Sequence, residues 1–172
     1  MIPVKYKNII YAEEKYIMQQ CNCLTITAHG LSKTLTENFP HGDAYEGRRA
    51  IGRRNCAIQE DRVEPGSVGI LEGEDNLPQI ICLYAQFRPG KTNSTYSYPK
   101  DYPDQKSDRL RYFEEGLDCL LDYFEDEGVK IAVPYGIGCG LAGGKWDSYL
   151  KLLESFHSSL KKNGGGLVLY KI

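Results

Sequence analysis

The segment PYGIGCGLAGGKW, residues 134–146, contains five glycines among thirteen positions. It follows the apolar run IAV at 131–133, which is typical of a buried strand, and it precedes a segment with helical spacing. Backbone N–H groups in such a loop can approach a phosphate closely, because glycine has no side chain and the following helix N-terminus favours an anion. The segment therefore indicates a phosphate-binding loop between a strand and a helix.

Two common glycine-loop designs fit this segment poorly. A P-loop needs GxxxxGK followed by Ser or Thr, but Trp146 follows Lys145 and Cys139 stands at the position of the first glycine. Residues 138–143 do satisfy GxGxxG, yet a dinucleotide fold places that pattern in its first strand-to-helix turn. Only one more helix and one more strand follow here, which argues against an NAD-dependent oxidoreductase. We keep that function as a third hypothesis, behind two that follow from the whole chain.

Composition narrows the class of protein further. With 172 residues, 41% hydrophobic and 26% charged, we expect one globular domain over residues 1–172. A net charge of -2 argues against a dedicated nucleic-acid binder. We find no signal peptide and no run near the ~20 apolar residues of a membrane span, so we expect a cytoplasmic protein, or a nuclear one in a eukaryote, with no membrane partner.

The six cysteines predict reduced thiols in a core rather than a disulfide scaffold. Cys21 and Cys23 form a CxC pair, but no second cysteine pair or nearby histidine completes a zinc set. We therefore expect neither a metal nor a cofactor.

Hydrophobic periodicity predicts the elements that must position the glycine loop. Strands and helices alternate through the second half, so helices on both faces of a mixed sheet are expected, with ligands at the carboxyl ends of its strands. The loops after Gln20, Phe87 and Tyr135 should then share one cleft. Strands are predicted at 4–10, 15–21, 67–71, 79–87, 129–135 and 167–172, helices at 29–39, 107–128 and 146–160, and long loops at 40–66 and 88–106.

Four segments together resemble the macro domain family across nearly the whole chain. GIGCGL with Trp146 shortly after it resembles the second ligand loop of that family, and HGLSKTL resembles the glycine loop that opens its first helix. Residues 6–23 resemble its first ligand strand and the strand ending in asparagine, and LVLY resembles its closing strand. The form IGCGL…W is most similar to the branch of terminal ADP-ribose glycohydrolases and related phage and bacterial proteins. The resemblance implies a three-layer α/β/α macro domain with a central mixed β-sheet.

The same resemblance implies a site for ADP-ribose. Asn22 would hold the hydroxyls of the distal ribose, Asn8 would accept the adenine amino group, and Tyr170 would stack on adenine. Glycine-loop N–H groups would bind the diphosphate, facing the loop at Gly30. The ligand-binding residues implied in this way are Asn8, Ile9, Asn22, Gly30, Leu31, Gly136, Ile137, Gly138, Cys139, Gly140, Leu141 and Tyr170.

Two functions remain open at this point. One is a hydrolase that removes ADP-ribose from a protein or nucleic acid, or phosphate from ADP-ribose 1″-phosphate; the other is a non-catalytic reader of ADP-ribose, and in either case we expect a monomer. The glycohydrolase branch uses a lysine together with an aspartate that directly follows GCGL. This chain has Ala142 at the position of the aspartate and no obvious lysine in SVGIL or in the turn EGEDN after it. What remains is water attack on the distal ribose, with Asn22 positioning the sugar and His29 or a ligand phosphate oxygen taking the proton.

Overall fold

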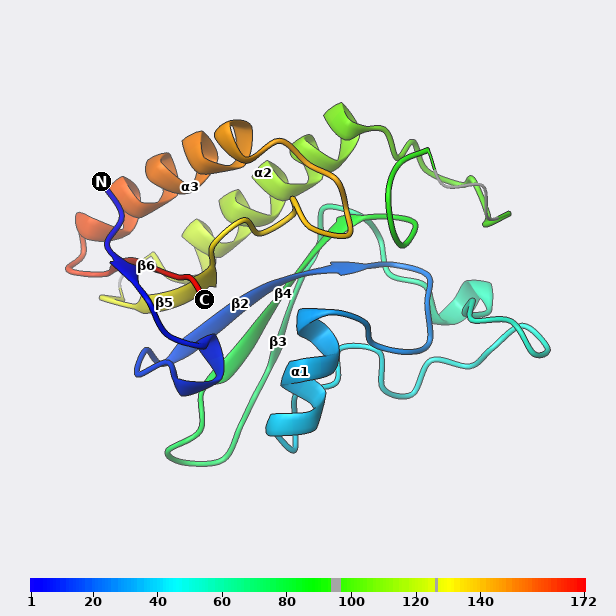
Figure 1. Cartoon of the computed structure of the whole chain (residues 1–172), viewed down its shortest axis with the longest axis horizontal. Helices are drawn as coiled ribbons and strands as arrows, with labels where there is room; N and C mark the ends of the chain where they lie inside the picture. The colour runs from blue at the N-terminus through cyan, green and yellow to red at the C-terminus, as the bar shows by residue number, and fades with distance from the viewer. Residues whose placement is uncertain (94–96, 126) are drawn as a thin grey trace.

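The computed structural model of the chain describes residues 1–93, 97–125 and 127–172. Within these residues, helices cover both faces of a six-stranded sheet, so the molecule has three layers (Figure 1). In chain order the elements are β1 (Val4–Lys5), the 3-10 turn η1 (Ile9–Tyr11), β2 (Tyr16–Asn22), α1 (Leu31–Asn38), the 3-10 turn η2 (Gln59–Asp61), β3 (Val68–Leu71), β4 (Gln79–Gln86), α2 (Lys106–Tyr123), β5 (Lys130–Pro134), α3 (Trp146–Lys161) and β6 (Gly166–Tyr170).

The strand order is β1-β6-β5-β2-β4-β3. β3 runs antiparallel to β4 and every other neighbouring pair is parallel, so the sheet is mixed and the predicted three-layer α/β class is confirmed. β5, β2 and β4 lie side by side, and their carboxyl ends meet at one edge of the sheet. The segments that follow Asn22, Gln86 and Pro134 therefore converge, as ligand loops do in open sheets of this kind.

Helices α2 and α3 pack together on one face of the sheet (Figure 1). Their buried residues recur every three or four positions, which forms one stripe along a helix. α2 buries Phe113, Leu117 and Leu120, and α3 buries Leu153 and Phe156. Each such side chain contributes roughly 1.5–3 kcal/mol when it leaves water. The two apolar stripes expected from the sequence thus hold this layer against the sheet.

Helix α1 covers the opposite face (Figure 1). Leu35 is fully buried, and Phe39 packs directly after the last helical residue. The thiols of Cys21 and Cys82, from β2 and β4, lie in the same apolar cluster. Four of the six cysteines are buried, as core thiols should be, whereas Cys119 is exposed on α2.

The first strand is shorter than the sequence predicted. β1 ends at Lys5 instead of continuing to residue 10. The side-chain oxygen of Asn8 accepts the backbone N–H of Ile10 at 3.2 Å and starts turn η1. A short polar side chain of this kind competes with strand pairing for the backbone N–H groups.

Helix α2 also has different ends from those predicted. Its N-cap is Gln105 rather than Ser107, and the backbone N–H of Gln105 donates to the Asp108 carboxylate at 2.9 Å in a capping box. The helix ends at Tyr123, before Gly128 is reached. Residue 126 of the predicted helix and residues 94–96 of the predicted loop lie outside the described residues. None of the described helices is long and apolar enough to cross a membrane.

A buried histidine joins α3 to β6. His157 is 6% exposed, and its Nδ1 accepts the backbone N–H of Leu167 at 2.9 Å. Burial, followed by the charge of Lys161, holds the pKa of His157 below its ordinary value. Because protonation would remove the lone pair that accepts this bond, the folded state favours the neutral ring.

This contact predicts a loss of stability in mild acid. The folded state binds a proton at His157 less readily than the unfolded chain, whose histidine pKa is 6.5. The stabilising contribution is therefore complete above that pH and is lost as pH falls through the lower folded pKa. We expect the melting temperature to drop between pH 7.5 and 5, and His157→Gln, which keeps an acceptor that does not titrate, to flatten that slope. His29→Gln serves as the exposed control, and equal slopes in wild type and His157→Gln would contradict the prediction.

Candidate functional site

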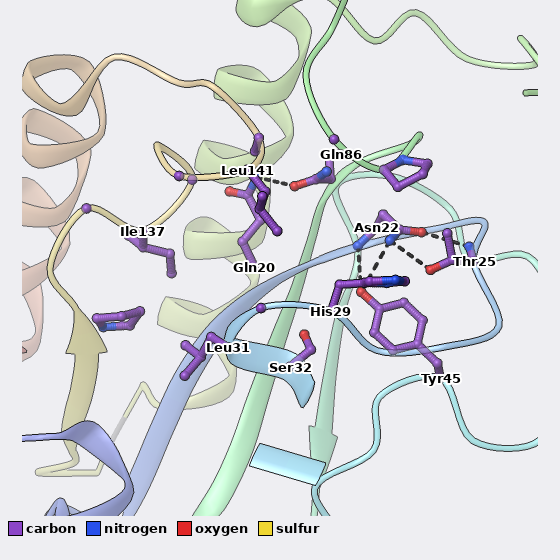
Figure 2. Close-up of a pocket in the computed structure, with 18 of the residues that line it drawn as sticks. Gln20, Asn22, Thr25, His29, Leu31, Ser32, Tyr45, Gln86, Ile137 and Leu141 are labelled. Atoms are coloured by element: carbon purple, nitrogen blue, oxygen red, sulfur yellow. Dashed lines mark hydrogen bonds between the residues drawn. The ribbon is translucent and has the colours of Figure 1, made fainter. Parts of the chain in front are cut away.

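A cavity of about 620 Å³ opens where β2, β4 and β5 end. Its size falls within the ≈ 300–1,000 Å³ typical of small-molecule sites. The lining comes from residues 20, 22 and 25 at the end of β2, 29–32 at the start of α1, 86, 89 and 90 at the end of β4, and 134–138 and 140–142 at the end of β5, with Tyr45, Asn55 and Tyr98 from the two long loops. The loops expected to share a cleft therefore do so (Figure 2).

The structure brings most of the predicted site residues together. Residues that line the cavity are Asn22, His29, Gly30, Leu31, Gly136, Ile137, Gly138, Gly140 and Leu141. Asn8, Ile9, Cys139 and Tyr170 are not part of its lining.

The glycine loop holds unused hydrogen-bond donors. Its turns close through the N–H of Cys139, bonded to Gly136 O at 2.9 Å, and the N–H of Gly144, bonded to Gly138 O at 2.9 Å. Among the described residues, no acceptor is found for the N–H groups of Gly138, Gly140, Leu141 and Ala142. All four of these residues line the cavity. A row of free N–H groups in a concave loop is an anion-binding arrangement.

The glycines in this loop have different roles. Gly138 has φ +77°, and a Cβ there would lie 2.5 Å from Tyr149 Cε1 and 2.8 Å from Gln20 Oε1. Only glycine fits between those side chains. Gly140 has no positive φ, and a Cβ added to it would meet nothing within 4 Å. The turn does not require glycine at 140, so its bare backbone is open toward the cavity.

The opposite wall is the start of α1. Gly30 has φ +56°, and a Cβ at this position would lie 3.3 Å from Leu141 Cδ1 of the glycine loop. The first N–H groups of a helix have no partner within it, and those of α1 begin at Leu31. Backbone N–H groups that have no acceptor among the described residues thus belong to two walls of the cavity.

Asn22 lies in the cavity wall but is fully engaged by the protein. Its Nδ2 donates to Thr25 Oγ1 at 2.9 Å and to the Tyr45 hydroxyl at 3.4 Å, while its Oδ1 accepts the N–H groups of Leu24 at 2.9 Å and Thr25 at 2.8 Å. These bonds use the whole hydrogen-bonding capacity of a carboxamide. In this state the amide shapes the turn after β2, and to hold a ribose it must release one of these partners.

Tyr45 and His29 complete that end of the cavity. The Tyr45 hydroxyl oxygen accepts the backbone N–H of Asn22 at 3.2 Å, and burial is the main cause that raises the pKa of Tyr45, so the phenol stays protonated. The His29 side chain is exposed and points toward the end that holds Asn22 and Tyr45 (Figure 2).

The residues expected around adenine have other partners. Asn8 uses its side-chain oxygen to start turn η1, and Ile9 is buried in the core beside α1. The Tyr170 hydroxyl donates to Glu14 Oε2 at 2.6 Å and accepts from Lys5 Nζ at 3.3 Å, and the residue is 3% exposed. An adenine site at these residues stays a prediction. The Cys139 thiol donates to Ile137 O at 3.4 Å and packs against the core, and burial raises its pKa.

A buried arginine holds the loops in place. The Arg109 guanidinium on α2 donates to both carboxylate oxygens of Asp104 at 3.1 and 2.7 Å, and to the backbone oxygens of Arg88 at 3.0 Å and Ala142 at 3.1 Å. A further bond reaches Gly90 O. The Asp104 oxygens in turn accept the N–H groups that follow β4. One side chain therefore connects α2, the segment after β4 and the glycine loop.

Sequence reasoning missed several lining residues. Thr25, Tyr45, Asn55 and Gln86 were not among the predicted site residues, although all of them line the cavity. For Tyr45 and Asn55 the available signal was the length of the loop at 40–66, since long loops in compact domains are often functional. That signal indicates the segment without selecting a residue.

No known protein-family profile matches the sequence. The chain is 26% identical over 159 residues to an uncharacterized 17.5 kDa protein from the tk-vs intergenic region of Enterobacteria phage T4, covering 88% of this chain and 86% of that protein. Among solved structures it is similar to the macrodomain of Mycobacterium tuberculosis DarG, with TM-score 0.70, 18% identity and coverage of 100% of this chain and 98% of that one. The macrodomain of Thermus aquaticus DarG gives TM-score 0.64, 19% identity and the same coverages. The Oceanobacillus iheyensis macrodomain gives TM-score 0.58 and 12% identity over 98% of this chain and 81% of that one. These likenesses show the macrodomain fold.

Removal of the buried arginine should be strongly destabilising. Arg109→Met removes the two hydrogen bonds that the guanidinium donates to the buried Asp104 carboxylate and leaves Arg88 Nε, at 3.4 Å, as its nearest cation. Breaking a buried ion pair typically costs about 3–5 kcal/mol. Adding Asp104→Asn removes the poorly compensated charge and should recover part of the loss. We expect denaturant unfolding to show this order, with Arg111→Met, two residues away at an exposed pair, as the control. If Arg109→Met were no worse than Arg111→Met, the proposed connection would be wrong.

Proposed function

We propose that this chain, which has the macrodomain fold, binds ADP-ribose in the cavity at the carboxyl edge of its sheet. The observation that carries the proposal is the set of unpaired backbone N–H groups at Gly138, Gly140, Leu141 and Ala142, which faces the N-terminus of α1. A diphosphate that joins two sugars needs many donors at close range. Glycine-loop amides and a helix N-terminus supply them without side-chain bulk.

The architecture favours this ligand over a nicotinamide cofactor used for hydride transfer. A dinucleotide fold has the strand order 3-2-1-4-5-6 and binds pyrophosphate after its first strand. Here the order is β1-β6-β5-β2-β4-β3, and the glycine loop follows β5. The GxGxxG match within residues 138–143 therefore does not mark the dinucleotide-binding loop, which follows the first strand of that fold.

Hydrolysis at the distal ribose is the finer proposal, and His29 favours it. Its exposed imidazole points toward the end of the cavity opposite Ile137, where the ligand's second sugar would lie (Figure 2). In this mechanism a water attacks the anomeric carbon while His29 accepts the water's proton. The bond from that carbon to the modified protein or nucleic acid breaks with its electron pair, and the leaving atom takes a proton from solvent. A non-catalytic reader is the alternative that binds without this step.

Gly140→Glu tests the diphosphate site. We expect wild type to bind ADP-ribose with a micromolar dissociation constant, about -8 kcal/mol. The carboxylate should abolish binding by occupying the space of the diphosphate and repelling it. Because a Cβ at Gly140 meets nothing within 4 Å, the fold should be unaffected. Calorimetry measures the affinity, thermal melting checks the fold, and Gly140→Ala is the small uncharged control.

Two results would contradict this prediction. Unchanged affinity in a folded Gly140→Glu variant would show that the loop N–H groups do not bind the ligand. No heat and no thermal shift for wild type at millimolar ADP-ribose would overturn the proposed function itself.

His29→Ala separates the enzyme from the reader. General-base catalysis contributes at least about a hundred-fold in rate, so the variant should lose at least that much in kcat. ADP-ribose affinity should change little, because a base that acts in the transition state adds little to ground-state binding. The substrates are mono-ADP-ribosylated acidic side chains, ADP-ribosylated DNA and ADP-ribose 1″-phosphate, with His41→Ala, outside the cavity, as control. Binding without turnover of any substrate by wild type would favour the reader.

A further inference from the structure

Asn55 is held in the cavity wall by a small hairpin in the loop between α1 and β3. Ala50 and Ala57 form an antiparallel bridge, and Ile51 N–H donates to Cys56 O at 2.8 Å. The N–H of Ala57 donates to Leu24 O at 2.7 Å, which attaches the hairpin to the segment after β2. Cys56 and Ala57 are fully buried, so the backbone of the adjacent Asn55 has a fixed position.

The orientation of the Asn55 amide is also determined. Its Oδ1 accepts the backbone N–H of Ile26 at 2.9 Å and the hydroxyl of Thr27 at 3.2 Å. A backbone N–H can only donate, so the atom facing Ile26 must be oxygen and the NH₂ group must lie on the other side. Among the described residues, the Asn55 Nδ2 has no hydrogen-bond acceptor.

This free amide distinguishes Asn55 from the other carboxamides of the cavity. Asn22 has both N–H groups engaged. The Gln20 Nε2 donates to Gln86 Oε1, and the Gln86 Nε2 donates to Arg88 O. Asn55 alone among these four lining amides offers two N–H donors that the described residues do not use. An oriented donor pair costs little to engage, since the protein has already fixed it.

We propose that the Asn55 amide nitrogen binds oxygen acceptors of the distal ribose, so that Asn55 makes the cavity prefer ADP-ribose to ADP. This inference rests on the proposed function. With the diphosphate between the glycine loop and α1, and with Asn22 at the distal ribose as the resemblance implies, the second sugar would extend toward Thr25 and Tyr45, which lie at the same end of the cavity as Asn22 (Figure 2). Asn55 lies at that end, since it is bonded to Ile26 and Thr27 directly after Thr25. Its donors are neutral, which suits hydroxyl and ring oxygens.

Calorimetry with ADP-ribose and ADP tests the inference. Wild type should bind ADP-ribose about ten-fold more tightly than ADP, as expected when a fixed donor pair gains acceptors. Asn55→Ala should remove most of that preference while its ADP affinity stays within about two-fold of wild type. The unchanged ADP affinity reports an intact cavity, and Asn38→Ala, exposed at the end of α1, is the matched control.

The outcomes separate this inference from the function on which it rests. If wild type binds both ligands equally, Asn55 confers no preference and the inference is overturned without any variant. A preference that survives in Asn55→Ala overturns the inference but leaves ADP-ribose binding in place. Equal loss of both ligands in a variant that melts like wild type also overturns it. Binding of neither ligand by wild type removes the proposed function, and the inference with it.

Discussion

The geometry of the cavity depends on the buried ion pair between Arg109 and Asp104, which are 1% and 2% exposed. Removing two charges from water is costly, and their attraction offsets the cost only when other hydrogen bonds satisfy both groups. Here five bonds from the guanidinium use all of its N–H donors. Three of them end on backbone oxygens of the loops, including Gly90 and Ala142. The pair therefore fixes where two walls of the site stand.

The parts of the fold that depend on apolar periodicity could be predicted from the sequence. The stripes through Phe113 and Leu153 and the helix starting at Trp146 were all found where expected. The burial of Arg109 could not be predicted in this way. Arg109 and Arg111 are two positions apart in one polar helix start, and the buried one is identified by carbonyl oxygens that approach it from distant loops.

In the site, too, the sequence indicates which residue types lie in the loops, whereas the hydrogen-bond partners of those residues depend on the fold. The glycine loop could be predicted to line a cavity because glycine has no side chain and leaves its backbone accessible. Asn22 was recognised as an amide at the end of a strand, but the number of its free hydrogen-bonding positions depends on Thr25 and Tyr45. Asn55 has the same side chain in a segment without periodicity. Its proposed role depends on Ile26, whose backbone N–H donates to the Asn55 Oδ1 and so turns the Nδ2 to the other side.

A site built from backbone N–H groups places an unusual constraint on the chain. Donors at Gly138 and Gly140 are present whatever side chain stands there, so substitutions remove them only by blocking access or by moving the loop. At Gly138 the constraint is packing, because Tyr149 leaves no room for a Cβ; at Gly140 it is the space in front of the backbone. Such donors carry no net charge, which agrees with a protein whose formal charge is -2. In the proposed site, recognition would depend on where oxygens of the ligand meet fixed neutral donors, so discrimination between ligands would depend on shape and on the Asn55 amide.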